Sequence, residues 1–421
     1  MRKIKSYVIN GGKRLEGKVT ISGAKNASLP ILAASLMATQ PVTLRNIPQI
    51  SDVEIMLEML KALGMRCSWL DHHTLRLVPP KQLNTKAPEK FLREMRASVL
   101  VVGPVLAKEG RIIVTQPGGC NIGPRPIDYH IKGMEALGAL IREDSGLIIF
   151  ESDRLLGGEI MLDYPSVGAT ENIMCAASLG SGKTIIQNAA KEPEIIELQN
   201  FLNLLGARVK GAGTDRITII GVNSLGGTDY TVIPDRIEAG TYLAAGAITG
   251  GEVTVEPVII EHLEAILAKM VEMGFEITKG ANSVRIKAMQ RGKAIGLRSM
   301  PYPGFPTDML PEMIPLLCLA TGVSMVYETV FSSRLKHVDD LVRMGAQIKT
   351  EGRLAIITGV SALHGTTVKA TDLRAGSALI LAGLAAKGQT IVENAEHIDR
   401  GYEDIVGKLQ AIGAEISGVS E

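Results

Sequence analysis

The chain has 421 residues, 46 % of them hydrophobic, and a formal net charge of +1. This length suits two domains of about 200 residues, and the near-neutral charge argues against a nucleic-acid-binding surface, which needs a basic face. The apolar runs fall far short of the roughly 20 residues that span a bilayer, and the sequence opens without an apolar signal core, so we expect a cytoplasmic protein that binds no membrane.

A unit of roughly 70 residues recurs six times along the chain. In each copy a short β-branched run leads into a helix-like stretch that ends in a glycine preceded by Leu, Met or Ile. The six glycines are Gly64, Gly138, Gly206, Gly274, Gly345 and Gly413. A near-fixed period indicates a repeated structural unit. Each copy reads as a strand, an apolar helix, a strand, an amphipathic helix and a hairpin, so we predict an α/β protein of six βαβαββ repeats.

The first helix of each repeat is apolar around most of its circumference, which is typical of a helix buried on all sides. These helices are predicted at residues 27–38, 97–107, 168–179, 239–249, 309–320 and 376–386. The second helix is amphipathic, as in residues 52–60, and we expect it to cover the outer face of a sheet. In the fourth copy we predict strands at 230–233 and 252–256, helices at 236–249 and 260–274, and a hairpin at 275–287.

The last repeat is incomplete and indicates how the chain divides into lobes. Copies one to five end in a hairpin, whereas the sixth ends in a single strand at residues 415–418. We predict that residues 6–10 supply the missing partner strand. One lobe then comprises residues 22–233, which carry three repeats, and the other comprises residues 1–21 and 234–421. A cleft between two lobes is the expected place for a ligand.

The second repeat carries an additional loop. We compared the distance from the polar residue that closes the strand to the repeat glycine. This distance is 17 to 19 residues in the other copies, but 22 residues from Gln116 to Gly138. The excess falls at residues 117–126, which include Cys120 and Arg125. Function concentrates in loops held by a rigid scaffold, and nearby Arg125 and Lys132 could lower the pKa of a thiol. We therefore predict that Cys120 is catalytic, and that the three other cysteines, which lie in apolar runs, are structural.

Cations recur where the buried helices begin. They are Lys25, Arg96, Arg236 and Arg374. A helix N-terminus attracts anions, so a cation placed there favours a site for a negatively charged ligand. The alternative is that each cation pairs with a local acid such as Asp235 or Asp372. For the four cations as a set we favour anion binding.

Two further motifs carry no functional prediction. Residues 180–184 resemble a phosphate-binding loop, but they lie on a turn from helix into strand, whereas that loop runs from strand into helix. His72 and His73 fall in a hairpin without metal partners, and we expect them to face solvent. The four cysteines form no CxxC pair and no metal spacing.

The sequence resembles the enolpyruvyl transferases over essentially its whole length. The motifs that carry the resemblance are Gly23-Ala24-Lys25-Asn26, Met95-Arg96-Ala97-Ser98, Pro117-Gly118-Gly119-Cys120 through Arg125-Pro126, residues 166–170, 188–194 and 305–308, Ala370-Thr371-Asp372-Leu373-Arg374 and Arg400-Gly401-Tyr402-Glu403. The Gly-Gly-Cys loop is specific to the branch of the family that uses UDP-N-acetylglucosamine. One departure is Phe331-Ser332-Ser333 before Arg334, where the family more often has Glu-Asn.

The resemblance implies a two-lobed inside-out α/β barrel, with three repeats in each lobe, buried helices and outer sheets. It also implies a reaction in which the enolpyruvyl group of phosphoenolpyruvate moves to the 3′-hydroxyl of UDP-N-acetylglucosamine and phosphate is released. The reaction proceeds by addition and elimination through a tetrahedral ketal and is the first committed step of peptidoglycan synthesis. The resemblance implies a monomer that uses no cofactor and no metal.

The resemblance also assigns roles to individual residues. The catalytic set is Cys120, Asp308, Lys25 and Arg400, with Cys120 as the acid that protonates C3 and Asp308 as the base for the sugar hydroxyl. Phosphoenolpyruvate is expected to contact Lys25, Asn26, Arg125, Arg374 and Arg400. The nucleotide sugar is expected to contact Arg96, Arg125, Pro126, Ile127, Asp128, Tyr129, Tyr164, Pro165, Ser166, Val167, Asp308 and Val330.

Alternatives remain open at this point. Asp308 could serve as the N-cap of the helix after Thr307, and Asp372 could act as its partner in catalysis. At the level of the whole chain, one alternative is an enzyme like 5-enolpyruvylshikimate 3-phosphate synthase, which activity with shikimate 3-phosphate would identify. Another is a catalytically silent paralogue that binds nucleotide sugars, which would bind its ligand without turnover.

Overall fold

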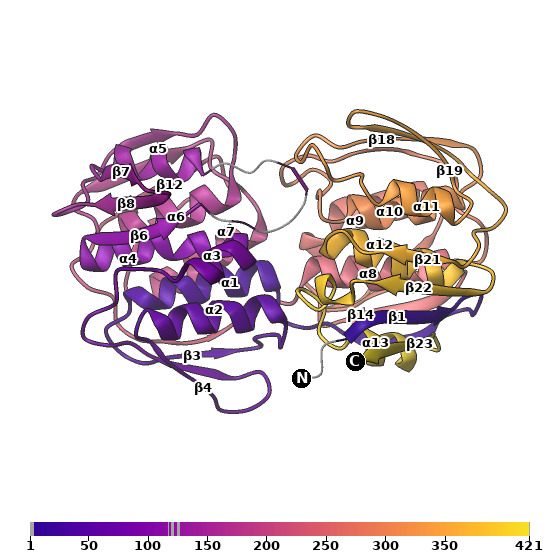
Figure 1. Ribbon diagram of the computed structural model, residues 1–421, viewed down its shortest axis with the longest axis horizontal. Helices are drawn as coiled ribbons and strands as arrows, with labels where there is room; N and C mark the ends of the chain where they lie inside the picture. The colour runs from indigo at the N-terminus through magenta and orange to yellow at the C-terminus, as the bar shows by residue number, and fades with distance from the viewer. Residues whose placement is uncertain (1–3, 117, 119–121, 124–126, 421) are drawn as a thin grey trace. The chain divides into compact units, whose positions relative to one another are not determined.

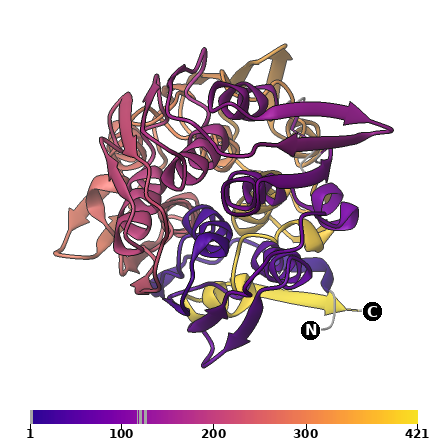
Figure 2. The same ribbon diagram turned by 90° about the vertical axis from the view of Figure 1, so that its left-hand side faces the viewer.

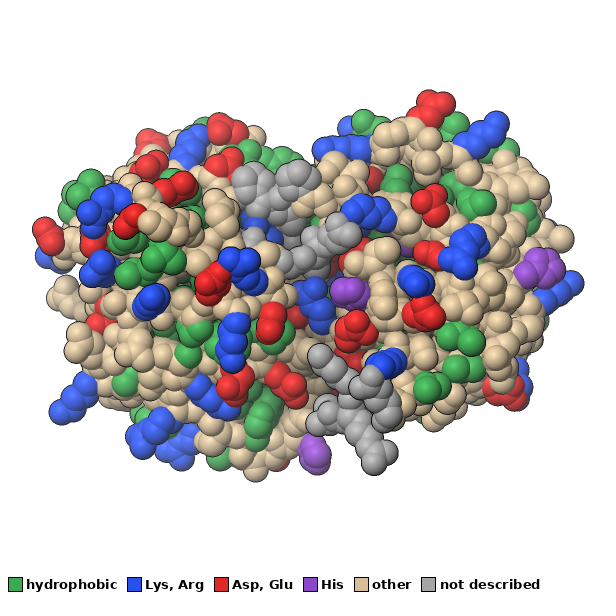
Figure 3. Space-filling model, viewed as in Figure 1, with side chains coloured by type: hydrophobic (Ala, Val, Ile, Leu, Met, Phe, Trp, Pro, Cys, Tyr) green, Lys and Arg blue, Asp and Glu red, His purple; other side chains and the backbone are tan. Residues whose placement is uncertain are grey.

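Figure 1 shows the computed structural model, which describes residues 4–116, 118, 122–123 and 127–420. The chain forms two compact units, and each has its own hydrophobic core. The central unit holds residues 23–120 and 125–233, and the terminal unit holds residues 1–22, 121–124 and 234–421. On the face drawn in Figure 3, Lys and Arg are interspersed with Asp and Glu, in keeping with the near-neutral net charge.

The described residues of the central unit form three sheets, whose strands run in the orders β13-β3-β5-β4, β6-β8-β7 and β11-β12-β10-β9. Their bounds are β3 (Val42–Arg45), β4 (Arg66–Trp69), β5 (Leu75–Val78), β6 (Arg111–Thr115), β7 (Leu140–Asp144), β8 (Leu147–Glu151), β9 (Glu159–Met161), β10 (Lys183–Gln187), β11 (Arg208–Lys210), β12 (Arg216–Ile220) and β13 (Asp229–Thr231). The helices are α1 (Lys25–Ala34), η1 (Ser35–Met37), α2 (Ser51–Ala62), α3 (Glu89–Glu94), η2 (Arg96–Val101), α4 (Val102–Glu109), α5 (Asp128–Ala136), α6 (Val167–Ser178) and α7 (Pro193–Leu204).

In the terminal unit the described residues also form three sheets, in the orders β15-β16-β14-β2, β17-β18-β20-β19 and β21-β22-β1-β23. Their bounds are β1 (Ile4–Asn10), β2 (Glu16–Thr20), β14 (Glu252–Glu256), β15 (Glu276–Lys279), β16 (Val284–Lys287), β17 (Gly296–Arg298), β18 (Val323–Tyr327), β19 (Gln347–Glu351), β20 (Leu354–Thr358), β21 (Thr367–Lys369), β22 (Gln389–Glu393) and β23 (Glu415–Ser420). The helices are α8 (Arg236–Ile248), η3 (Ile260–His262), α9 (Glu264–Glu272), α10 (Leu310–Cys318), α11 (Val338–Arg343), α12 (Leu373–Ala385), η4 (Ala395–His397) and α13 (Ile405–Ala411).

Six βαβαββ repeats account for this order of elements, which confirms the predicted α/β fold. In a typical sheet the first two strands of the repeat pair in parallel, and the hairpin adds two antiparallel strands. In the third repeat, β9 pairs in parallel with β10, β12 pairs antiparallel with β10, and β11 pairs antiparallel with β12. The second repeat is the exception, because a single parallel bridge between Lys86 and Ile113 stands in place of its first strand. Figure 2 looks onto the central unit, with its helices in the middle and its hairpins at the periphery.

The first helices of the repeats are buried as predicted. Every residue of α10 is buried, and so are residues 373–384 of α12 and 169–178 of α6. The second repeat differs from the prediction, because η2 precedes α4 where one continuous helix was expected. Pro104, the third residue of α4, has no N–H to donate to the carbonyl of Leu100, so one α-helical hydrogen bond is absent at this junction.

The second helices do not cover the outer faces of the sheets, so that prediction was wrong. In β18 the outward side chains Val323, Met325 and Tyr327 are exposed. The second helix instead packs on a buried helix and on the hairpin strand that follows it, as α2 does on α1 and β4, and α7 does on α6 and β11. Its apolar stripe is therefore needed to enclose the helical core.

The six glycines of the repeat share one conformation. Their φ angles lie between 86° and 107°, in the left-handed region that favours glycine. At Gly64 the N–H donates to the carbonyl of Lys61, and the N–H of Met65 donates to Leu60. This is the Schellman arrangement that ends a helix, and the other five glycines repeat it. The fixed spacing of these glycines therefore marks the end of the second helix in every repeat.

The strand exchange at the ends of the repeats is partly as predicted. β1 pairs antiparallel with β23 and with β22, which confirms that residues 6–10 complete the sixth repeat. The opening strand of the fourth repeat was misassigned to residues 230–233. β13 pairs in parallel with β3 of the first repeat, and the fourth repeat opens with β2, which pairs with β14. The chain passes from one unit to the other after β2 and again after β13, and each of these strands pairs within the unit that the chain is leaving.

Candidate active site

Asp308 forms the centre of an ion-pair cluster in the terminal unit. It lies in the turn before α10, and one carboxylate oxygen pairs with Nη2 of Arg334 while the other lies 3.3 Å from Nη2 of Arg374. Both arginines are almost fully buried, with 4 % and 3 % of their surface exposed. The N-cap of α10 is Met309, which makes no side-chain cap bond, so the interpretation of Asp308 as a helix cap was wrong.

Arg374 is held by contacts at two of its three guanidinium nitrogens. Nη1 donates to the hydroxyl of Tyr402 at 2.9 Å, and Nη2 faces Asp308. Nε is buried and has no acceptor among the described residues. Burial alone would lower the pKa of the guanidinium, but Tyr402, Asp308 and Glu312 together raise it well above its ordinary value. The group is therefore a permanent cation whose Nε–H has no acceptor among the described residues.

Asp372 serves as the N-cap of α12. Its Oδ1 accepts from the backbone N–H groups of Arg374 and Ala375, at 3.0 and 3.2 Å. A capping acid stabilises the start of the helix that carries Arg374. The guanidinium of Arg374 therefore does not pair with the local acid. Asp372 accepts from the backbone of the helix, and Asp308 pairs with the guanidinium.

Glu328 fixes the segment that contains Val330. This carboxylate is fully buried and accepts from the hydroxyls of Ser299 and Thr307, both at 2.8 Å. It also accepts from the N–H groups of Val330 and Phe331, at 2.6 and 3.0 Å. Thr307 directly precedes Asp308, the predicted base. The Glu328 carboxylate therefore links Val330 to the turn that carries Asp308.

In the central unit, Lys25 is the first residue of α1 and forms a buried ion pair with Asp52. The Nζ and Oδ2 atoms are 2.6 Å apart, and the two side chains are 11 % and 2 % exposed. Asp52 lies in the first turn of α2, where the helix dipole favours a carboxylate. The pairing acid is thus distant in sequence. Asn26 follows as the second residue of α1 and is half-buried.

The predicted nucleotide-sugar residues of the central unit lie at the starts of helices. Arg96 opens η2, and Ser166 caps α6 by accepting from the N–H of Ala169 at 3.4 Å. Ile127 is the N-cap of α5, which begins at Asp128 and Tyr129. Tyr164 and Pro165 precede the cap of α6, and Val167 is its first residue. These positions belong to neighbouring elements, because α6 packs against both η2 and α5.

Asn172 of α6 joins these neighbouring elements through its side-chain amide. Its Nδ2 donates to the carbonyl of Val99 at 2.9 Å and lies 2.8 Å from Nδ1 of His130. Its Oδ1 accepts from the N–H of Gly103 at 2.7 Å. A side chain at Gly103 would clash with the carbonyl of Asn172 at 2.3 Å, so only glycine permits this close helix contact.

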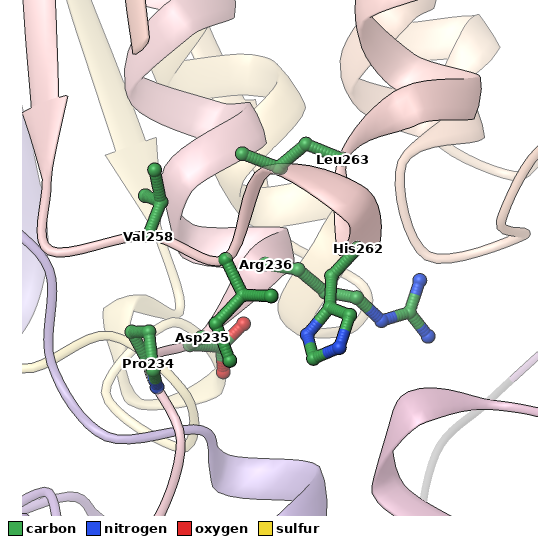
Figure 4. A pocket seen from close by; sticks show the side chains of 7 residues that line it. Pro234, Asp235, Arg236, Val258, His262 and Leu263 are labelled. Carbon is green, nitrogen blue, oxygen red and sulfur yellow. The ribbon is translucent and has the colours of Figure 1, made fainter. Parts of the chain in front are cut away.

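Arg236 opens α8, beside a pocket of the terminal unit. The pocket is lined by Pro234, Asp235, Arg236, Val258, Ile259, His262 and Leu263 (Figure 4). Asp235 caps α8 by accepting from Ile237 and Glu238, and the Arg236 guanidinium lies 5.7 Å from the centre of the Tyr302 ring. As at Arg374, the local acid binds the backbone of the helix while the cation's side chain makes a separate contact.

Three predicted site residues, Cys120, Arg125 and Pro126, lie outside the described residues. Arg400 lies in the turn after η4 and is half-buried. The neighbouring Asp399 accepts a 2.5 Å hydrogen bond from the hydroxyl of Tyr7, which ties this turn to strand β1. Lys132, expected to act on the Cys120 thiol, pairs with Asp163 at 2.8 Å.

The other cysteines are unreactive by their surroundings. Burial raises the pKa of Cys67 and of Cys318 to about 12, and burial with the nearby Glu171 raises that of Cys175 further. Thiols with such values remain protonated at neutral pH and are poor nucleophiles. Among the described residues, no group of three or more His, Cys, Asp or Glu side chains could hold a metal ion, and no helix is long and apolar enough to cross a membrane.

Sequence reasoning missed Asp52 and Glu312 as members of the candidate site. Glu312 lies on α10 and is fully buried, and it accepts hydrogen bonds from Thr241, Ser377 and Tyr402. A signal was present, because Glu312 is the single charged residue between Leu310 and Ala320 in an otherwise apolar helix. Asp52 gave no comparable signal, since an acid in the first turn of an amphipathic helix is ordinary.

The comparisons with known proteins identify the family of the chain. Residues 9–409 match the family model described as EPSP synthase (3-phosphoshikimate 1-carboxyvinyltransferase). The chain is 53 % identical over 418 residues to UDP-N-acetylglucosamine 1-carboxyvinyltransferase 1 of Symbiobacterium thermophilum, covering 98 % of this chain and 95 % of that protein. It is 51 % identical to UDP-N-acetylglucosamine 1-carboxyvinyltransferase 2 of Carboxydothermus hydrogenoformans, covering 99 % of this chain and all of that protein.

Solved structures show the same fold. The enolpyruvyl transferase NikO from Streptomyces tendae superposes with a TM-score of 0.90 at 25 % identity, covering 99 % of both chains. EPSP synthase from Acinetobacter baumannii superposes with a TM-score of 0.76 at 20 % identity, covering 98 % of this chain and all of that one. The chain therefore belongs to the EPSP synthase family of enolpyruvyl transferases, and it is similar over nearly its whole length to relatives named UDP-N-acetylglucosamine 1-carboxyvinyltransferase.

Proposed function

We propose that this chain transfers the enolpyruvyl group of phosphoenolpyruvate to the 3′-hydroxyl of UDP-N-acetylglucosamine and releases phosphate. The observation that carries the proposal is the similarity, at 50 to 53 % identity over nearly the full chain, to relatives that bear the name of this activity. The buried cations of the terminal unit support it, because phosphoenolpyruvate carries a phosphate and a carboxylate that guanidinium groups bind well.

The proposed chemistry is an addition followed by an elimination. The sugar hydroxyl attacks C2 of phosphoenolpyruvate while C3 takes up a proton, which gives a tetrahedral ketal. C3 then loses a proton and the bond from C2 to the phosphate oxygen breaks, so the enol ether forms and the hydroxyl proton leaves with phosphate. Fixed cations at the phosphate and the carboxylate offset the negative charge that develops in this sequence.

In the terminal unit, the proposal assigns phosphoenolpyruvate to Arg374 and Arg400, and the sugar hydroxyl to Asp308. Both Asp308 oxygens already accept from guanidinium groups. A carboxylate offers about four lone-pair sites, so these pairs leave capacity for the hydroxyl. Val330 is assigned to the nucleotide sugar, and its segment is anchored by Glu328.

In the central unit, the proposal assigns phosphoenolpyruvate to Lys25, Asn26 and Arg125, and the protonation of C3 to Cys120. The nucleotide sugar is assigned to Arg96, Arg125 and the residues at the starts of α5 and α6, which are Pro126, Ile127, Asp128, Tyr129, Tyr164, Pro165, Ser166 and Val167. The N-terminal ends of α5 and α6 carry the positive end of the helix dipole, which suits the diphosphate of the nucleotide. We further propose that the chain acts as a monomer in the cytoplasm, at the first committed step of peptidoglycan synthesis; sedimentation of the purified chain tests the monomer.

The test is release of phosphate from phosphoenolpyruvate with UDP-N-acetylglucosamine, with shikimate 3-phosphate, and with no acceptor. The proposal expects release with the nucleotide sugar alone. The second candidate, the reaction of 3-phosphoshikimate 1-carboxyvinyltransferase, is favoured by the description of the matching family model and expects release with shikimate 3-phosphate. Protein that is folded and binds UDP-N-acetylglucosamine but releases no phosphate would instead be a silent paralogue.

A further inference from the structure

The terminal unit contains a buried polar network centred on Glu312 of α10. This carboxylate is fully buried and accepts three hydroxyl hydrogen bonds. Oε1 accepts from Ser377 at 2.7 Å and from Tyr402 at 2.6 Å, and Oε2 accepts from Thr241 at 2.6 Å. Thr241 lies on α8 and Ser377 on α12, while Tyr402 lies in the segment before α13. Burying an ionised carboxylate is costly unless it is hydrogen-bonded, and these three donors meet that requirement.

Glu312 sets the direction of the Tyr402 hydroxyl. A phenol has one proton to donate and a carboxylate can only accept, so the Tyr402 proton points to Glu312 across 2.6 Å. The lone pairs of the same oxygen then face Nη1 of Arg374 at 2.9 Å, and the Thr241 hydroxyl oxygen, whose proton goes to Glu312, lies 2.8 Å away. The guanidinium also lies over the Tyr402 ring, 5.5 Å from its centre. Glu312 thus acts on Arg374 through Tyr402.

The contacts leave Arg374 with a single orientation. Tyr402 holds Nη1, Asp308 lies 3.3 Å from Nη2, and Nε has no acceptor among the described residues. A buried N–H without an acceptor is destabilising, and an anionic ligand oxygen would remove that cost. The planar guanidinium is therefore fixed in orientation by the hydrogen bonds of Nη1 and Nη2 to protein groups.

We propose that Glu312 and Tyr402 are positioning residues that orient Arg374 to bind phosphoenolpyruvate. The inference rests on the proposed function, since Arg374 is assigned to that substrate there. Neither residue touches the reacting atoms in this account. Both act through the guanidinium, so their loss weakens the binding of phosphoenolpyruvate more than the binding of the nucleotide sugar.

The main test variant is Tyr402→Phe, which removes one hydroxyl and keeps the ring. Its matched control is Tyr242→Phe on α8 of the same unit. Tyr242 is also fully buried, but its hydroxyl has no hydrogen-bond partner among the described residues. We expect Tyr402→Phe to raise both the KM and the calorimetric Kd for phosphoenolpyruvate about 10-fold or more, as for one lost hydrogen bond to a charged group. The control should stay within about 2-fold of wild type on the same scale.

A double-mutant cycle tests whether Glu312 acts through Tyr402. Glu312→Gln keeps an acceptor and the size of the side chain but removes the charge. If the two residues form one relay, Glu312→Gln raises the KM for phosphoenolpyruvate in the wild-type background and adds little in the Tyr402→Phe background. Effects that multiply in the double variant would contradict the relay.

A merely structural network gives a different result. In that case Tyr402→Phe lowers the melting temperature while the KM and Kd for phosphoenolpyruvate stay at their wild-type values, and the inference is overturned. Measurements on the wild-type protein distinguish failure of this inference from failure of the proposed function. Wild type that binds phosphoenolpyruvate but does not turn over refutes the proposed function and still tests the relay through the Kd. Wild type that does not bind phosphoenolpyruvate overturns both.

Discussion

Lys25 and Asp52 form a buried ion pair, with Nζ and Oδ2 2.6 Å apart, that joins the first turn of α1 to the first turn of α2. Lys25 is a proposed ligand of phosphoenolpyruvate, so the pair holds a candidate site residue in place. Removing one partner of a buried pair leaves a charge with less compensation, which is much more costly than losing an exposed pair.

Asp52→Asn should therefore lower the free energy of unfolding by about 3–5 kcal/mol. The matched control is Glu58→Gln on the same helix, which breaks the exposed pair between Glu58 and Lys61 and should cost less than about 1 kcal/mol. Urea unfolding of the two variants measures the difference. Equal, small losses would show that the Lys25 ammonium does not depend on Asp52.

Arg374→Lys keeps the positive charge but removes the planar guanidinium, which donates to Tyr402 and to Asp308 at the same time. We expect kcat/KM for phosphoenolpyruvate to fall by about 10- to 100-fold, since a single ammonium replaces two directed bonds. The control is Arg142→Lys on β7, whose exposed pair with Glu151 is distant from any proposed role. A folded Arg374→Lys enzyme with wild-type kcat/KM would remove Arg374 from the substrate site.

Only one cysteine should react with a thiolate-directed electrophile in the folded protein. Burial holds the pKa of Cys67, Cys175 and Cys318 far above neutral, which leaves Cys120. We expect the epoxide fosfomycin to label Cys120, and Cys120→Asp to abolish the labelling. Mass spectrometry of the digested protein locates the adduct. An adduct that persists in the Cys120→Asp variant would mean that the wrong thiol was chosen.

The repeat could be predicted from sequence because its markers are local. Gly64 and its five counterparts end helices through backbone bonds within six residues, so their spacing alone indicates the period. The pairing of β1 with β23 could also be predicted, since a sheet that lacks one strand identifies a missing partner. The placement of β13 could not, because pairing of Asp229–Thr231 with β3 joins segments nearly 190 residues apart.

The candidate site was predictable in its residue types but not in its contacts. A cation at a helix start is visible in the sequence, but its partner is set by tertiary packing. Arg374 lies beside Asp372 in the chain, yet its guanidinium pairs with Asp308. The alternative of Asp308 as a local helix cap was raised for the same reason. Glu312 is functional in our account only because α8, α12 and the segment before α13 bring hydroxyl groups to it.

Glu238 should make stability depend on pH. Its carboxylate accepts from the N–H of Ser22 and pairs with Lys408 at 2.7 Å, and burial raises its pKa to about 7 despite both contacts. The folded chain therefore keeps this proton up to about pH 7, while the unfolded chain releases it near its ordinary value of about 4.3. Because the folded state binds more protons in that window, stability falls as pH rises through it, by up to about 3 kcal/mol.

Glu238→Gln removes the titrating group. The variant should lose less free energy of unfolding than wild type between pH 5 and pH 7, measured by urea unfolding at each pH. The control Glu264→Gln replaces an exposed acid of the same unit, which pairs with Lys279, and should keep the wild-type pH dependence. Identical slopes for wild type and Glu238→Gln would contradict the account of this buried carboxylate.

The most direct test of the account is product analysis by NMR after incubation with phosphoenolpyruvate and UDP-N-acetylglucosamine. We predict one phosphate released for each nucleotide sugar that gains a pair of vinyl protons at its 3′-oxygen. Phosphate released without a change in the nucleotide sugar, or no reaction from protein shown to be folded, would contradict enolpyruvyl transfer as the function of this chain.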